Sequence, residues 1–184
     1  YASKMQESAT RMQNMIQELL QYSLVSAKGD PFRSIDLNKV VKEVLEDLEV
    51  SIRNSNGTVH TESLPTVEAD PAQMRQLFQN LISNAIKFTK KEEPPKIELV
   101  AKPCKKDVWD IFVKDNGIGF DSQHDNSIFQ PFFRLNGRNQ YEGSGIGLAI
   151  CKKIVDRHHG KIKAVSSKNE GSIFQMTLPI KQAP

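Results

Sequence analysis

The sequence has few of the features that mark a secreted or membrane-spanning protein. It holds two cysteines, Cys104 and Cys151, which stand far apart with no second Cys or His at metal-ligand spacing. We therefore expect two reduced thiols, as is usual in the cytosol, and no disulfide or zinc site. No apolar run approaches the roughly 20 residues that span a bilayer, and no basic segment followed by an apolar one opens the chain. We expect no membrane contact by this chain and a cytoplasmic location, whether the parent protein is soluble or membrane-anchored.

A strong excess of one charge is also lacking. Lysine and arginine number 25 against 22 acidic residues, and this excess is too small to indicate nucleic acid as a partner. The hydrophobic content of 38% and charged content of 26% are typical of a soluble globular protein. At 184 residues we expect one principal core with an appended element such as a long helix.

The N-terminal segment, from Tyr1 to about Ser26, lacks Gly and Pro and carries Met5, Met12 and Leu19 at intervals of seven. This spacing predicts a helix with a pairing seam. Such a helix cannot bury its stripe alone, so its partners belong to another segment or to a second copy. The other apolar residues that accompany the repeat are Met15, Ile16, Leu20 and Tyr22. Gly29, Asp30 and Pro31 break the pattern, which predicts a division into residues 1–28 and 32–184.

The remaining chain alternates helical and strand patterns. Asp36 and Asp70 are expected to cap helices, the second with Pro71 at its first position and Gln73 completing a capping box. We expect these helices over 37–52 and 71–89, and a further one over 146–158, with strands near 59 and 67, over 97–101 and 108–115, and two after Gly160. This order predicts an α+β fold, a two-layer α/β sandwich with helices on one face of a mixed sheet.

A stripe of amides with one lysine flanks the apolar face of the helix after Asp70. A solvated helix face usually mixes Glu and Lys, whereas amides beside a lysine suit a site that holds a cation and its anion. Periodicity alone leaves a plain solvated surface equally open. The stripe comprises Gln73, Gln76, Asn80, Asn84 and Lys87.

Two glycine-rich segments follow. Asp115 shares a strand face with Ile111 and Val113, where a buried carboxylate needs a hydrogen-bond donor, and Asp115–Gly119 lets the backbone approach a flat ligand, although a plain β-turn fits too. The turn Gly143–Leu148 leads into a helix, whose N-terminal N–H groups attract phosphates. It is not a Walker loop, since no Gly-Lys-Ser/Thr follows.

In order along the chain, four segments resemble the N, G1, F and G2 boxes of histidine kinases. They are Asn80–Phe88, Asp115–Gly119, Ile128–Arg134 and Gly143–Leu148. The stretch Met12–Ser23 is similar to the second helix of the dimerization and phosphoacceptor hairpin, and Gly171–Pro179 to the closing strand of the catalytic domain. The resemblance is greatest to hybrid and phytochrome-like sensor kinases, and it implies the Bergerat-type ATP-binding fold.

The resemblance also implies roles for single residues. Asn84 would ligate Mg²⁺ with Asn80 beside it, while Lys87 and the lid residue Arg134 would contact phosphates. Asp115 would accept a hydrogen bond from the adenine amino group. The base pocket would be formed by Gly117, Gly119, Phe88, Ile118 and Thr177, and the triphosphate admitted by Gly143, Gly145, Gly147 and Leu148. Asn80, Lys87 and Arg134 would be the catalytic residues, with ATP and Mg²⁺ as cofactors.

The implied activity is transfer of the γ-phosphoryl group of Mg-ATP to a histidine and then to an aspartate of a response-regulator receiver domain, in a homodimer joined through the N-terminal helix. The family's acceptor histidine is followed by an acidic residue. None of His60, His124, His158 and His159 stands in that setting. We therefore expect the acceptor upstream of Tyr1, and no autophosphorylation by this chain alone.

Three other functions compete. A gyrase, mismatch-repair or heat-shock type ATPase positions water with an acidic residue, where this sequence has Asn80. An anti-sigma type serine kinase lacks the heptad helix. A pseudokinase interaction module is disfavoured because every nucleotide box holds chemically suitable residues.

Overall fold

The computed structural model describes residues 2–27, 29–124, 127–134 and 144–182. The helices are α1 (Ala2–Ala27), α2 (Leu37–Asp47), α3 (Glu49–Asn54), α4 (Pro71–Lys87) and α5 (Gly147–Arg157), with 3-10 turns η1 (Ser122–His124) and η2 (Ser127–Phe129). The strands are β1 (Arg33–Asp36), β2 (Thr58–Thr61), β3 (Thr66–Ala69), β4 (Lys96–Lys105), β5 (Val108–Asp115), β6 (Lys161–Ser167) and β7 (Gly171–Pro179).

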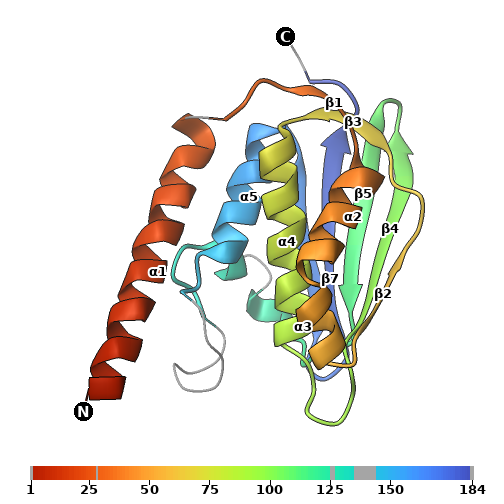
Figure 1. Cartoon of the computed structure of the whole chain (residues 1–184). Helices are drawn as coiled ribbons and strands as arrows, with labels where there is room; N and C mark the ends of the chain where they lie inside the picture. The colour runs from red at the N-terminus through yellow and green to blue at the C-terminus, as the bar shows by residue number, and fades with distance from the viewer. Residues whose placement is uncertain (1, 28, 125–126, 135–143, 183–184) are drawn as a thin grey trace.

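The molecule has two layers, with α2, α4 and α5 packed on one face of a sheet (Figure 1). The sheet has the strand order β2-β4-β5-β7-β6, in which β2 and β4 run parallel and the other neighbours antiparallel. β1 and β3 form a separate antiparallel pair. The predicted α+β sandwich with a mixed sheet is confirmed. None of the described helices is both long and apolar enough to cross a bilayer.

The caps at the helix starts agree with the sequence in part. Asp36 accepts from the Asn38 amide at 2.9 Å and Asp70 from the Gln73 amide at 3.1 Å, as predicted. The prediction of a capping box is wrong, because the Gln73 side chain makes a tertiary contact instead: its amide donates to the Val25 carbonyl at 2.9 Å. The predicted continuous helix over 37–52 is also wrong, since it breaks at Leu48, between α2 and α3.

Both cysteines are unpaired, as expected. Cys104 is exposed, whereas Cys151 lies inside α5 with no exposed surface. Burial raises the pKa of the Cys151 thiol to about 12, so that thiol is a neutral core side chain at physiological pH.

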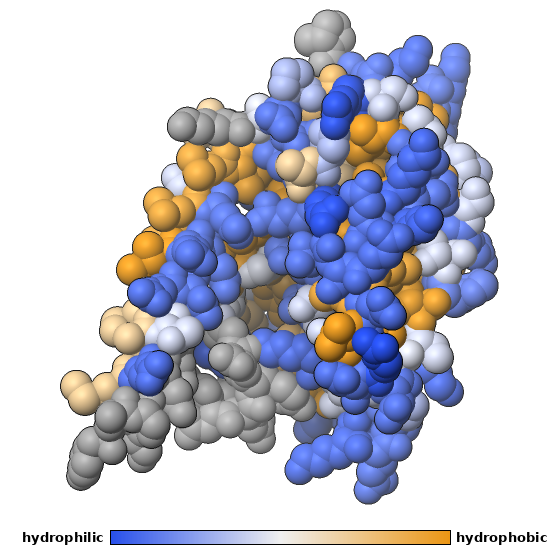
Figure 2. Space-filling view, in the orientation of Figure 1, coloured by the Kyte–Doolittle hydropathy of each residue, from blue (hydrophilic) through white to orange (hydrophobic). Residues whose placement is uncertain are grey.

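α1 lies along α5 and turns one side toward it (Figure 1). Tyr22 and Val25 belong to this docked side: the Lys153 ammonium lies 4.3 Å from the Tyr22 ring and donates to the Tyr22 carbonyl at 2.8 Å, and Val25 is buried. Tyr22, predicted to accompany the heptad seam, therefore packs within the chain instead. Hydrophobic residues lie along the outer edge of α1 (Figure 2). The exposed large hydrophobic residues of this helix include Met5, Met12, Met15, Ile16, Leu19 and Leu20.

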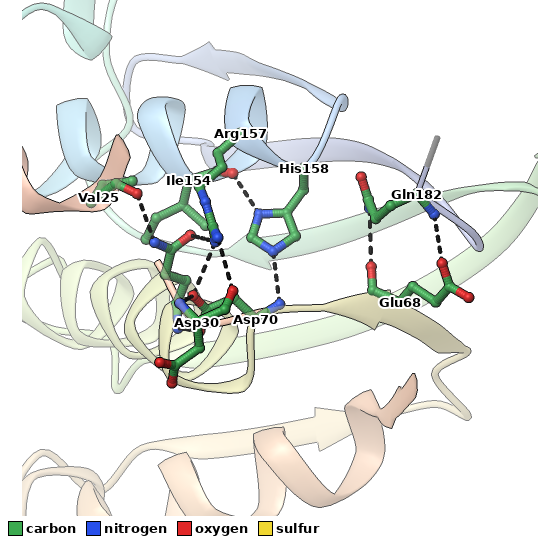
Figure 3. A network of polar contacts seen from close by, with 9 residues as sticks. Val25, Asp30, Glu68, Asp70, Ile154, Arg157, His158 and Gln182 are labelled. Carbon is green, nitrogen blue, oxygen red and sulfur yellow. Dashed lines mark hydrogen bonds and ion pairs between the residues drawn. The ribbon is translucent and has the colours of Figure 1, made fainter. Parts of the chain in front are cut away.

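A polar network ties the end of α1 and the linker to α4 and α5 (Figure 3). The Arg157 guanidinium contacts the buried Asp70 carboxylate at 3.0 Å, the Gln73 side-chain oxygen at 2.9 Å and the Asp30 carbonyl at 2.8 Å. The Asp70 amide donates to Nε2 of His158 at 3.0 Å, so Nδ1 carries the proton, bonded to the Ile154 carbonyl at 2.7 Å. His158 is thus neutral, and burial lowers its pKa.

This neutral histidine predicts a loss of stability in mild acid. As pH falls below about 6.5, His158 takes up a proton in the unfolded chain but stays neutral in the folded chain. The free energy of unfolding therefore decreases until the pH passes the lowered pKa of folded His158. His158→Gln should therefore flatten the stability profile measured by urea unfolding between about pH 7.5 and 5.5. His60→Gln, on an exposed strand, is the control. An unchanged slope in His158→Gln would contradict the assignment.

Candidate functional site

A cavity of about 280 Å³ opens between α4, the start of α5 and the ends of β5 and β7. Its volume lies near the lower end of the roughly 300 to 1,000 Å³ usual for ligand pockets. Its walls comprise Glu18, Asn80, Ser83, Asn84, Ala85, Lys87, Phe88, Asp115, Ile118, Gly119, Phe120, Ile128, Phe133, Arg134, Ser144, Gly145, Gly147, Leu148, Ser172 and Phe174. Each of the four predicted boxes contributes to this one cavity.

α4 supplies one wall through the stripe that its sequence predicts. Asn80, Asn84 and Lys87 follow one another at helical spacing and all line the cavity. The adjoining face of the helix is buried in the core through Met74, Leu77, Phe78, Leu81, Ile82 and Ala85. The Asn80 amide donates to the Gly147 carbonyl at 3.2 Å. This bond fixes the start of α5 beside α4, so that the two helices form one corner of the cavity.

Asp115 closes the cavity at the end of β5. Its Oδ1 accepts from the amides of Gly117 at 2.8 Å and Ser172 at 3.2 Å. Burial raises the pKa of the Asp115 carboxyl, and these two N–H donors oppose that shift. Since both donors bind the same oxygen and the side chain lines the cavity, Oδ2 is the oxygen left to accept from a ligand.

The loop after β5 is held against the end of α4. The Ile118 amide donates to the Phe88 carbonyl at 2.9 Å. A side chain at Gly117 would collide with that same carbonyl, and Gly119 has a φ of 60° with no room beside the Ser167 carbonyl. Glycine is therefore required at both positions. Phe88, Ile118 and Phe120 then present apolar surface to the cavity next to Asp115.

The start of α5 faces the other end of the cavity. Gly145, Gly147 and Leu148 line it, as does Arg134 from the segment before. Gly143, which was predicted to admit phosphates, lies outside the described residues. Arg134 lies beside Gly145 at this end. Lys87, whose ammonium lies 4.8 Å from the Phe88 ring, is the other of these two cationic side chains in the cavity lining.

Thr177 does not join the site. On β7 the residues Phe174, Met176 and Leu178 face the helices, so Thr177 points to the opposite side of the sheet, where its hydroxyl donates to Asp110 at 2.6 Å. The prediction for Thr177 is wrong for this reason. Ser172 shares the alternation of Phe174 and Met176, lines the cavity and donates its amide to Asp115. That alternation was visible in the sequence and would have selected Ser172.

Glu18 and Ser144 are further lining residues that the motifs missed. Glu18 comes from α1, far away in sequence, and nothing local signals its place. Ser144 lies within the predicted glycine-rich turn, but the roles predicted for that turn belong to its glycines and Leu148.

Comparison with known proteins places the chain in a family of ATPases. Residues 69–182 match the family model "Histidine kinase-, DNA gyrase B-, and HSP90-like ATPase". Cyanobacterial phytochrome A of Nostoc sp. is 41% identical over 174 residues, covering 95% of this chain and 22% of that protein. The adaptive-response sensory kinase SasA of Synechococcus sp. is 32% identical over 175 residues, 92% of this chain and 46% of that protein. The chain thus spans less than half the length of either relative.

Solved structures give the same result. The catalytic domain of histidine kinase ThkA superposes with a TM-score of 0.70 at 29% identity, covering 84% of this chain and 100% of that one. A structure of ThkA in complex with the response regulator protein TrrA has a TM-score of 0.73 at 28% identity, covering 95% of this chain and 49% of that one.

Proposed function

Because this chain belongs to the histidine kinase-, DNA gyrase B- and HSP90-like ATPase family, we propose that it is the Mg-ATP-binding catalytic part of a sensor histidine kinase. The observation that carries the proposal is the convergence of the four motif segments on one cavity whose lining holds a buried carboxylate, Asp115, and two cationic side chains, Lys87 and Arg134. This set of groups suits a purine base joined to a polyphosphate.

The adenine base belongs at the Asp115 end. Oδ2 of Asp115 accepts from the exocyclic amino group, while Oδ1 stays bonded to the Gly117 and Ser172 amides. Phe88, Ile118 and Phe120 supply apolar surface for the flat ring. Guanine carries a carbonyl oxygen in place of that amino group, which would face the carboxylate and repel it.

The phosphates belong at the start of α5, where free N–H groups and the positive helix end favour anions. Lys87 and Arg134, both in the cavity lining, add positive charge. Asn84, and Asn80 beside it, fit Mg²⁺, which prefers oxygen ligands and takes most of them from phosphates and water. When bound, Mg²⁺ would neutralise phosphate charge, and the chain's own groups hold the triphosphate in position for transfer.

In the intact protein we propose that the γ-phosphoryl group passes to a histidine outside these 184 residues and then to a receiver-domain aspartate. The ThkA–TrrA complex supports a response-regulator partner. The exposed apolar stripe on α1 supports a homodimer joined through that helix, with residues 1–28 as the hairpin segment and 32–184 as the catalytic domain. The two unpaired cysteines support a cytoplasmic site of action.

The metal assignment is tested at Asn84. Asn84→Ala should weaken Mg-ATP binding by roughly tenfold, since it removes a ligand from the metal. Titration calorimetry with Mg²⁺ and then with excess chelator checks this, and the two proteins should converge once the metal is removed. Gln79→Ala, an exposed amide on the same helix, is the matched control. Equal affinity of folded Asn84→Ala and the parent for Mg-ATP would remove the metal site.

A further inference from the structure

A carboxylate from α1 reaches the phosphate end of the cavity. Glu18 is half-buried while its neighbours Gln17 and Leu19 are exposed, and it lines the cavity with residues of α4 and α5. The Ser144 hydroxyl donates to Oε2 of Glu18. Ser144 Oγ in turn accepts from the Ile146 amide at 3.2 Å. A negative charge is thus linked through one hydroxyl to the first amide of the α5 start.

The start of α5 is the place where the proposed function puts a phosphate. Its N–H groups and the helix dipole stabilise an anion, and Glu18, bonded to the Ser144 hydroxyl, places a negative charge beside that helix start from within the chain. A carboxylate and a triphosphate at the same helix end repel each other, and the repulsion is strong where the surroundings are only partly wet. In the docked state, the Glu18 carboxylate therefore takes the place of a ligand phosphate at the start of α5.

The described contacts of residues 21–25 of α1 bring no negative side chain to the cavity. Gln21 accepts from the Gln76 amide at 3.0 Å, and the carbonyls of Tyr22 and Val25 accept from Lys153 and Gln73. These contacts hold α1 against α4 and α5 at points away from the phosphates. Among these described contacts of α1, the one made by Glu18 brings a charge that opposes the ligand.

We propose that docked α1 and the nucleotide triphosphate compete, with Glu18 acting as an internal anion that must leave the start of α5 when phosphates arrive. The inference rests on the proposed ATP-binding function. It makes the position of α1 a control on nucleotide affinity: when α1 is docked as here, triphosphates bind less tightly, and when they bind, the Glu18 contact opens.

The decisive variant is Glu18→Gln, which keeps the size and the hydrogen-bonding oxygen but removes the charge. Affinity for ATP should rise about fivefold, affinity for ADP by less, and affinity for adenosine should stay within about twofold, because the repulsion grows with phosphate charge. Glu46→Gln, an exposed change of equal charge on α2, should alter none of them. Calorimetry without and with Mg²⁺ measures all three ligands.

The outcomes separate the two hypotheses. If neither parent nor variant binds ATP, the proposed function fails. If both bind ATP equally, or if the gain is the same for adenosine, the competition fails while the function stands. Weaker Mg-ATP binding in Glu18→Gln would overturn the competition as well, since Glu18 would then be assisting the metal.

A second measurement needs no variant. Hydrogen exchange of the α1 amides around residues 18–25 should become faster with saturating Mg-ATP and stay unchanged with adenosine. Slower exchange with ATP would show that the nucleotide tightens the docked helix, which contradicts competition.

Discussion

Asp115→Asn is expected to weaken ATP binding by roughly 30-fold, because it replaces a charged acceptor facing the adenine amino group with an amide whose NH₂ opposes that donor. A hydrogen bond to a charged group is worth about 1.5 to 3 kcal/mol, and about 1.4 kcal/mol corresponds to tenfold in affinity. The parent's preference for ATP over GTP should shrink in the same variant.

The same substitution should not destabilise the unliganded protein. Burial raises the pKa of Asp115 because it disfavours the charged carboxylate, so the ionised form is a cost to the fold at neutral pH. Asparagine keeps an oxygen for the Gly117 and Ser172 amides and removes that charge. The free energy of unfolding should be equal to or higher than that of the parent, with the gain lost as pH falls through the raised pKa.

Asp110→Asn provides the matched control. Asp110 lies on the same strand but on the other side of the sheet, bonded to the Thr177 hydroxyl. It should leave affinity for ATP and GTP unchanged. Calorimetry with both nucleotides and chemical unfolding of all three proteins test the pair of claims; an Asp115→Asn protein that is stable and still prefers ATP as strongly as the parent would exclude Asp115 from base recognition.

The features that could be predicted from the sequence are those set by neighbours along the chain. Asp70 followed by Pro71 marks the start of α4, and the spacing of Asn80, Asn84 and Lys87 puts them on one side of that helix, as the structure shows. The alternation before Asp115 likewise places its carboxylate on the helix side of the sheet. Local geometry decides each of these.

The features that were missed depend on partners distant in sequence. Gln73 looks like a capping residue, but Val25 and Arg157 offer its side chain better-buried bonds. Tyr22 belongs to the apolar pattern of α1, yet its ring contacts the Lys153 ammonium of α5 on the docked side of the helix. Glu18 meets Ser144 only because α1 folds back along α5. No window of sequence contains both members of these pairs.

The largest expected effect is on phosphoryl transfer. The 184-residue chain should bind ATP but should transfer no phosphoryl group to any of its own histidines. His158 uses both ring nitrogens in buried bonds. His159 lies beyond the C-terminal end of α5, and the 11 residues of that helix span about 16 Å at 1.5 Å per residue from its start at the cavity. His60 lies on β2, an edge strand separated from β5 by β4. Reacting atoms must approach to about 3 to 3.5 Å, which these positions do not allow.

The test is to incubate two proteins with labelled ATP: the 184-residue chain, and a longer form that includes the proposed upstream helix with its histidine. Phosphoryl transfer depends mainly on positioning and charge stabilisation, so supplying the nucleophile should be enough to give acid-labile label on the longer form only. His124 is the residue to watch, because its ring lies 5.6 Å from that of Phe133, which lines the cavity. A His124→Gln variant of the short chain distinguishes the cases: stoichiometric label on the short chain that disappears in this variant would make His124 the acceptor and place the phosphorylated histidine within the catalytic domain itself.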